Sequence, residues 1–211
     1  MSGFRRLKNK IASLIRSLFS KRKSVKIGIY GPVNAGKTTL ANRICMDWLG
    51  EEMGAVSVIP HETREIQTKE NVTMEHEGKN LTFNLIDTPG IATKIDFEDF
   101  VKAGLPKGQA KSRAKEATKG VIEAIKWLEN MDMVLVVMDS SQDPVNQVNV
   151  TILGNLDARN IPFLIVGNKT DLKHAKLSRI KNAFPTYDVI GVSATKGDNV
   201  QNLYKTLIEK I

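Results

Sequence analysis

The chain has 211 residues, of which 41% are apolar and 26% are charged, and this predicts one full-sized domain with a short appendage. No window approaches the roughly 20 uninterrupted apolar residues of a membrane-spanning helix, so the sequence excludes an integral membrane protein. The single cysteine, Cys45, excludes a disulfide framework and fits a reducing cytoplasm. His61, His76 and His174 are not spaced as a metal site.

The first 24 residues carry all of the excess charge. They hold eight basic residues and no acid, which leaves 23 basic against 23 acidic groups in the rest of a chain of net charge +8. Apolar residues recur at helical spacing: Phe4, Leu7, Ile11, Leu14, Ile15 and Leu18. A basic amphipathic helix over 1–24 is expected, and its favoured role is to lie on an anionic membrane surface. The alternatives are a helix packed on the domain or on a partner protein, a basic arm on RNA, and a cleaved signal peptide, which Arg16 disfavours.

A glycine-rich segment, GPVNAGKT, runs from Gly31 to Thr38 between the apolar run 25–30 and a helical pattern. This context is typical of a phosphate-binding loop, in which glycines let backbone N–H groups turn toward a phosphate. Lys37 would then reach the outer phosphates, and the Thr38 hydroxyl would hold magnesium. A turn that binds nothing is disfavoured, because a lysine at a helix start is electrostatically misplaced without an anion.

Residues 51–71 are polar and are expected to form a functional loop that contains residues 61–65. A hairpin is expected next, with strands at 72–76 and 81–86. The second strand leads into DTPG, residues 87–90. Asp87 would lie near the magnesium and bind it through water, and Gly90 would let its N–H approach a terminal phosphate.

The remaining pattern alternates between strands and helices. Residues 91–110 are expected to be a long mobile segment, and the Lys/Glu-rich stretch 111–123 is interpreted as a solvated helix face rather than a binding patch. The expected elements are a helix over 111–130, a strand over 133–138, a helix from 143 to about 159, a strand over 161–166, a weak helix over 177–184, a strand over 189–192 and a helix over 199–210. This order predicts a mostly parallel sheet with helices on both faces and ligand loops at the carboxyl ends of the strands.

The segment NKTD, residues 168–171, indicates which base is bound. The Asp171 carboxylate can accept two hydrogen bonds from the N1–H and exocyclic amine of guanine, whereas adenine offers no such pair. Asn168 can bridge to the base or to neighbouring loops, and Lys169 can lay its stem over the ring. The backbone N–H of Ala194 can meet the guanine oxygen. The sequence therefore predicts a guanine nucleotide.

These motifs, in this order, resemble the small GTPase-like (TRAFAC) G domain over about residues 25–211. Within that family the chain resembles the Era/TrmE branch at Asn34, at Thr63-Arg64 and at Thr88-Pro89. The resemblance implies a P-loop NTPase fold with a six-stranded, mostly parallel sheet, one antiparallel strand and helices on both faces. The chain ends directly after the last expected helix, so the KH domain of Era and the larger tRNA-modifying assembly of TrmE are not expected to transfer.

The resemblance also assigns functional residues. It implies catalytic roles for Lys37, Thr63 and Gly90, and a magnesium ion held by Thr38, Thr63 and Asp87, with Thr68 as an alternative to Thr63. Thr63 would close on magnesium and the terminal phosphate when GTP is present. The residues expected to bind GTP or GDP are Gly31, Asn34, Ala35, Gly36, Lys37, Thr38, Thr39, Asn168, Lys169, Asp171, Ser193, Ala194 and Thr195.

Ile91 stands where Ras-like relatives carry a water-orienting glutamine. Slow hydrolysis is therefore expected, and the missing group would come from a partner or from a dimer formed through the two switch loops, which the resemblance places around Thr63 and after Gly90. Asn34 makes potassium a further candidate cofactor, because some members of the branch hold that ion there. The favoured function is a GTP-hydrolysing molecular switch, cytoplasmic and peripheral at the inner face of the membrane. The alternatives are an RNA- or ribosome-associated assembly GTPase and a GTP-dependent scaffold with negligible hydrolysis.

Overall fold

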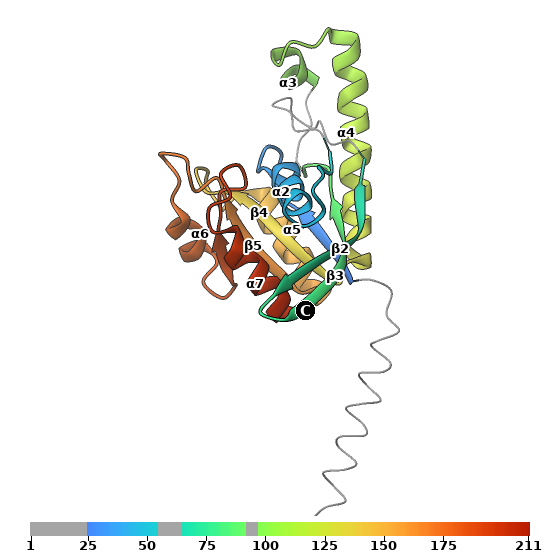
Figure 1. The fold of residues 1–211 in the computed structure, drawn as a ribbon. Helices are drawn as coiled ribbons and strands as arrows, with labels where there is room; N and C mark the ends of the chain where they lie inside the picture. The colour runs from blue at the N-terminus through green and yellow to red at the C-terminus, as the bar shows by residue number, and fades with distance from the viewer. Residues whose placement is uncertain (1–24, 55–64, 92–96) are drawn as a thin grey trace, which may run out of the picture.

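A six-stranded sheet forms the centre of the computed structural model, which describes residues 25–54, 65–91 and 97–211 (Figure 1). The strands lie in the order β2-β3-β1-β4-β5-β6. Their bounds are β1 (Val25–Tyr30), β2 (Gln67–His76), β3 (Lys79–Asp87), β4 (Met133–Asp139), β5 (Phe163–Asn168) and β6 (Val189–Gly191). The helices are α2 (Lys37–Leu49), α3 (Phe97–Lys102), α4 (Lys107–Trp127), α5 (Gln147–Ala158), α6 (Leu177–Ala183) and α7 (Val200–Lys210), with a 3₁₀ turn η1 (Leu128–Asn130) after α4.

Only β2 runs antiparallel to its neighbour in this sheet. It forms a hairpin with β3 through Glu77 and Gly78, whose φ angles of 50° and 75° belong to a tight turn with two left-handed residues. Strands β1, β3, β4, β5 and β6 are parallel, so their carboxyl ends meet at one edge. The expected sheet, mostly parallel with one antiparallel strand, is confirmed.

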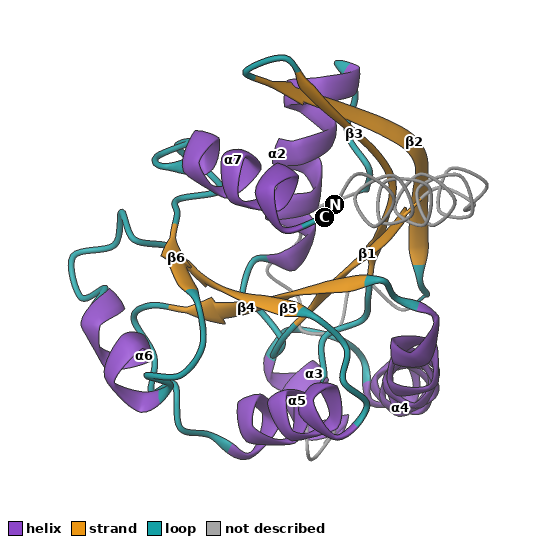
Figure 2. Ribbon diagram, turned by 90° about the horizontal axis from the view of Figure 1, so that it is seen from below, coloured by secondary structure: helices purple, strands orange, loops and turns teal. Residues whose placement is uncertain are grey.

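Helices cover both faces of the sheet, as Figure 2 shows: α2 and α7 lie on one face, and α4, α5 and α6 on the other. The side chains of each central strand alternate between these layers. Ile27 and Ile29 pack into the cluster under α2 and α7, whereas Tyr30 packs into the cluster on the opposite face. This burial on both faces explains the continuous apolar run of β4, whose residues Met133 to Met138 are all buried.

Three predicted boundaries are wrong by four residues or more, at the starts of β2, α4 and α5. β2 begins at Gln67, inside the expected 51–71 loop, and it continues past a bulge at Asn71, whose φ is 56°. Residues 97–110, which lie in the segment expected to be mobile, contain α3 and the start of α4. Helix α5 begins at Gln147, because the Asn146 side chain caps it by accepting a hydrogen bond from the Asn149 N–H.

Helix α4 reaches beyond the sheet, and its first turns project with α3 from the body (Figure 1). A small apolar cluster joins the two helices there, with Phe100 and Ala110 buried and Leu105 packed against them. Further along, α4 is tied to the sheet, because the Tyr30 hydroxyl donates to the Ala124 carbonyl at 2.9 Å. Among the described residues, no helix has the length and apolar character to cross a membrane.

Candidate functional site

The P-loop, Gly31–Thr38, leaves the carboxyl end of β1 and leads directly into α2. Its two glycines allow close approach to neighbouring loops. A Cβ atom on Gly31 would lie 2.2 Å from the Val137 carbonyl oxygen, and one on Gly36 would lie 2.3 Å from the Asn168 Nδ2. Gly36 also has a φ of 90°, which L side chains rarely adopt. The loop is therefore seated against β4 and β5 in a conformation that only glycine fits.

Lys37 is buried at the start of α2, and its Nζ donates to the Pro32 carbonyl oxygen at 2.9 Å. The side chain thus folds back along the loop that it follows. Burial lowers the pKa of Lys37 to about 8, although the negative charge of Asp87 opposes this effect. An ammonium group held in this way, at the N-terminal end of a helix, is stabilised by an anion in the loop.

Thr38 and Asp87 bring two oxygen groups together beside Lys37. Asp87 ends β3, which pairs with β1 in parallel register, and its Oδ2 accepts a hydrogen bond of 2.6 Å from the Thr38 hydroxyl. Its other oxygen, Oδ1, is buried with no hydrogen-bond partner within the described part of the chain. Burial raises the pKa of Asp87, opposed by the Thr38 hydrogen bond and by the charge of Lys37. A buried, unsatisfied carboxylate oxygen beside a hydroxyl fits a hard divalent cation.

The residues after Asp87 pass directly across the P-loop. The Thr88 hydroxyl donates to the Ile29 carbonyl oxygen at 2.6 Å, and the Ile91 N–H donates to the Gly31 carbonyl oxygen at 3.1 Å. A Cβ atom on Gly90 would lie 2.8 Å from the Val33 Cα, so glycine is needed for this crossing. The Ile91 side chain is buried in the core cluster that also contains Tyr30.

Asn168, at the end of β5, joins the P-loop to the loop after β6. Its Nδ2 donates to the Ala35 carbonyl oxygen at 3.0 Å, and its Oδ1 accepts from the Ala194 N–H at 3.0 Å. Of the two roles expected for Asn168, the structure shows the bridge between the neighbouring loops. The Ala194 N–H, expected to meet the guanine oxygen, has Asn168 as its hydrogen-bond partner in this structure.

Lys169 has a partner that the motifs did not indicate. Its Nζ lies 2.7 Å from the Asp139 Oδ2, and the other Asp139 oxygen accepts from the Ser141 N–H and hydroxyl. Burial alone would raise the pKa of Asp139, but the hydrogen bonds from Lys169 and Ser141 outweigh it and lower the pKa. The signal was present in the sequence, because Asp139 directly follows the buried run 133–138 at the ligand edge of the sheet.

The other base-loop residues lie on the same edge. Asp171 is half-buried in the turn after β5, where the Thr170 N–H donates to the Val192 carbonyl oxygen at 3.2 Å. Ser193 is buried, and its Oγ accepts from the Lys196 N–H at 3.1 Å, which closes the turn that exposes Thr195. The structure therefore brings residues 168–171 and 193–195 together, and we call these two segments the base loops.

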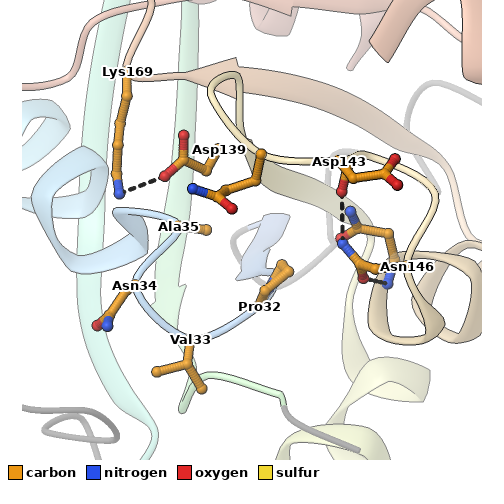
Figure 3. A pocket seen from close by; sticks show the side chains of 10 residues that line it. Pro32, Val33, Asn34, Ala35, Asp139, Asp143, Asn146 and Lys169 are labelled. Carbon is orange, nitrogen blue, oxygen red and sulfur yellow. Dashed lines mark hydrogen bonds and ion pairs between the residues drawn. The ribbon is translucent and has the colours of Figure 1, made fainter. Parts of the chain in front are cut away.

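A cleft of about 520 Å³ lies between the outer side of the P-loop and the loop that leads into α5. Figure 3 shows the Lys169–Asp139 ion pair on one side of it, with Asp143 and Asn146 on another. Asn34 lies at the edge of the P-loop with a φ of 61°. The lining residues are Pro32, Val33, Asn34, Ala35, Asp139, Gln142, Asp143, Asn146, Asn149 and Lys169.

Some expected site residues are not part of this group. Thr63 and Arg64 lie outside the described residues, as does the N-terminal segment 1–24. The alternative ligand Thr68 is exposed within β2, opposite Ile86 of β3. Thr39 is half-buried in the first turn of α2. Among the described residues, no group of three or more His, Cys, Asp or Glu side chains is placed to hold a metal ion.

Comparisons with curated proteins point to one group of GTPases. The chain is 32% identical to GTPase Era of Geotalea daltonii over 187 residues, which are 86% of this chain and 53% of that protein. It is 29% identical to GTPase Der of Campylobacter curvus and 27% identical to the tRNA modification GTPase MnmE of Thermotoga sp.. These matches cover 88% of this chain and 36% and 35% of the relatives. The chain thus spans about half the length of the Era proteins that it matches.

Solved structures agree on the fold. A complex of Era with MgGDPNP and a segment of 16S ribosomal RNA superposes with a TM-score of 0.67 at 22% identity, over 89% of this chain and 56% of the other. A probable GTP-binding protein engB gives a TM-score of 0.56 at 22% identity, over 88% and 97%. The family model described as 50S ribosome-binding GTPase matches residues 26–169. With the P-loop, Asp87 and the base loops in place, the chain belongs to this GTPase family, on its Era/TrmE-like branch.

Proposed function

We propose that the chain binds GTP and hydrolyses it to GDP and phosphate, and that the two nucleotide states act as a molecular switch. The observation that carries this proposal is the arrangement of the buried Lys37 ammonium, the Thr38 hydroxyl and the Asp87 carboxylate at the mouth of the P-loop. A cation and a hard-metal ligand pair beside a glycine-rich loop at a helix start suit the phosphates of a nucleotide.

Magnesium is the metal that best fits this arrangement. Thr38 would hold it directly and Asp87 through water, with the unsatisfied Asp87 Oδ1 available to accept from that water. Thr63 is the third proposed ligand and lies outside the described residues. When bound, magnesium supplies charge neutralisation between the outer phosphates.

The chain's own residues divide into phosphate and base contacts. Lys37 holds the outer phosphates, the backbone of Gly31 to Thr39 surrounds the inner ones, and Gly90 presents its N–H toward the terminal phosphate. At the base, the Asp171 carboxylate accepts hydrogen bonds from the N1–H and the exocyclic amine of guanine, beside the loop 193–195. Asn168 hydrogen-bonds to the P-loop and to the loop after β6, and so fixes the distance between the phosphate contacts and the base contacts.

Phosphate release measured from GTP and from ATP tests the proposal. We expect release from GTP but not from ATP, in magnesium and not in EDTA, and loss of release in Lys37→Ala. The matched control is Lys205→Ala, an exposed lysine on α7, which should keep the rate of the unchanged chain. Equal hydrolysis of ATP, or an unchanged rate in Lys37→Ala, would contradict the proposal.

Potassium is proposed as a second cation, held partly by Asn34. The support is that Asn34 belongs to the P-loop, has a left-handed backbone and is exposed, so its side chain is accessible to an ion. A monovalent cation there would offset charge that builds between the outer phosphates. Hydrolysis should be faster in potassium than in sodium, and Asn34→Ala should remove the difference. Equal rates in the two salts would dismiss the second cation.

The cellular setting is proposed from residues 1–24, which lie outside the described part of the chain. Their eight basic residues and apolar stripe favour a cytoplasmic protein peripheral to an anionic membrane surface. The intact chain should float with anionic liposomes, and a chain starting at Ser24 should not. If neither floats, the alternative is an RNA- or ribosome-associated GTPase, in which the same residues bind RNA. Negligible turnover by the intact chain would instead favour the GTP-dependent scaffold.

A further inference from the structure

Four lysines form a straight row along α4, and we call them the lysine row: Lys111, Lys115, Lys119 and Lys126. All four are exposed. The first three are spaced by four residues, which places them about 6 Å apart on one side of the helix, and the row is about 22 Å long. Glu116 and Glu123 lie on its flank.

The opposite side of α4 is already occupied. Val121, Ala124 and Leu128 pack into the core against the sheet, and Ala110 is buried against α3. The lysine row therefore faces away from these contacts, on a helix whose later turns are tied to the sheet and whose first turns project with α3 from the body (Figure 1). None of the four lysines belongs to the P-loop or to the base loops.

The charge on α4 is a local excess. The helix carries six basic and two acidic residues, whereas residues 25–211 together carry equal numbers of each. Lysines four residues apart on one helix repel one another, and Glu116 and Glu123 can offset only part of the charge of the six basic residues of α4. A partner with repeating negative charge would offset more of it. This concentration on a projecting face argues against the simpler interpretation of a solvated surface.

We propose that the lysine row binds the phosphodiester backbone of a nucleic-acid strand. Binding of this partner would be a function additional to GTP hydrolysis, and it would use a surface separate from residues 1–24. A nucleic-acid strand presents one charge per about 3.4 Å of axis, so each lysine in the row can reach a phosphate. A membrane suits the row less well, because Val121 and Ala124 of α4 pack into the core and leave only Ile122 and Trp127 as large exposed apolar side chains on this helix, fewer than a helix lying in a lipid interface presents.

The test compares two triple variants of the full chain loaded with GDP. The row variant carries Lys111→Gln, Lys115→Gln and Lys119→Gln, which keep helix propensity high. The control variant carries Lys79→Gln, Lys181→Gln and Lys205→Gln, which remove the same charge from exposed positions on other elements. Binding of a labelled single-stranded 20-mer, as RNA and as DNA of the same sequence, is followed by fluorescence anisotropy at several salt concentrations.

The row variant should bind the tighter of the two oligonucleotides at least tenfold more weakly at 0.1 M salt. Its slope of log affinity against log salt should be smaller by about 2, because three phosphate contacts are lost. The control should stay within threefold of the unchanged chain, and GTP turnover should be the same in all three proteins. The preference between RNA and DNA then identifies the source of the backbone.

Three results would overturn the proposal. The first is no oligonucleotide binding by the unchanged chain, and the second is an equal loss in the row and control variants. The third is row-dependent binding to anionic phosphatidylserine vesicles without row-dependent binding to either oligonucleotide, which would make the surface a lipid contact. Residues 1–24 are present in all three proteins, so binding that depends on that segment alone cannot imitate a difference between the variants.

Discussion

Asn168→Ala should separate the folding and binding roles of the base-recognition loops. The side chain is buried and takes part in three hydrogen bonds, to the Ala35 and Gly36 carbonyl oxygens at 3.0 and 3.5 Å and from the Ala194 N–H at 3.0 Å. At about 0.5–1.5 kcal/mol for each bond, the variant should lose about 2–4 kcal/mol of unfolding free energy. Because the lost bonds hold the P-loop to the base loop, GDP affinity should fall as well.

The assay is urea unfolding without nucleotide and at a series of GDP concentrations. Ligand binding to the native state adds RT ln(1 + [L]/Kd) to stability, so the GDP series yields Kd separately from the intrinsic loss. The matched control is Asn42→Ala. Asn42 is also buried and has three hydrogen bonds, donating to the Gly54 carbonyl and accepting from the Met53 and Gly54 N–H groups, but it contacts none of the base loops.

Both variants should lose similar stability without nucleotide, and only Asn168→Ala should show a weaker response to GDP. The reasoning is refuted if Asn168→Ala loses less than about 1 kcal/mol, since the buried Ala194 N–H and Ala35 carbonyl would then have found other partners. It is also refuted if the two variants respond equally to GDP, because the link between the loops would then have no part in binding.

Three further predictions concern single charged groups. Burial lowers the pKa of Lys37 from 10.5 to about 8, so between these values the unfolded chain binds more protons than the native one. Measured by urea unfolding without nucleotide, the stability of the unchanged protein relative to Lys37→Ala should therefore rise from pH 8 to 10, while its GDP affinity falls. The comparison cancels the opposite contributions of Cys45, Tyr30 and Tyr204, whose pKa values are raised by burial. Asp171→Asn should shift preference from guanine to xanthine nucleotides, since an amide offers one donor and one acceptor where the carboxylate accepts twice; competition binding measures this. Asp87→Asn should weaken magnesium binding at least tenfold in a titration of GDP-loaded protein, because the unsatisfied Oδ1 loses its charge.

The sheet could be predicted from the sequence because its central strands are buried on both faces. The run 133–138 has no polar residue, and a continuous apolar segment of this length between helical patterns has few other solutions. The P-loop and residues 168–171 were found for a different reason. Close backbone approach restricts positions 31 and 36 to glycine, so the conformation of the loop can be inferred from its sequence.

The features that could not be predicted from the sequence depend on contacts between residues that are far apart in the chain. β2 starts at Gln67 because it pairs with Asp87 of β3, and the polar composition of 67–71 gives no sign of a strand that is partly exposed and bulged. The start of α5 was misplaced because Asp143 and Asn146 are both good caps, and Asp143 instead accepts from the Val145 N–H in the preceding turn. Asp139 could be placed at the ligand edge from the sequence, but its pairing with Lys169, which follows β5, is apparent only once β4 is known to lie beside β5.

Ile91 limits where the groups that complete hydrolysis can come from. Its side chain is buried in the core cluster with Tyr30, and its N–H is bonded to the Gly31 carbonyl oxygen. Turning this position toward a water molecule at the terminal phosphate would expose an isoleucine at a cost of about 1.5–3 kcal/mol and would break that bond. The position is therefore part of the support for the P-loop, and a polar side chain placed there would be directed into the core. The attacking water must therefore be oriented by groups other than Gly90 and Ile91. The cation proposed at Asn34 and an activating partner are two candidate sources of this water-orienting group.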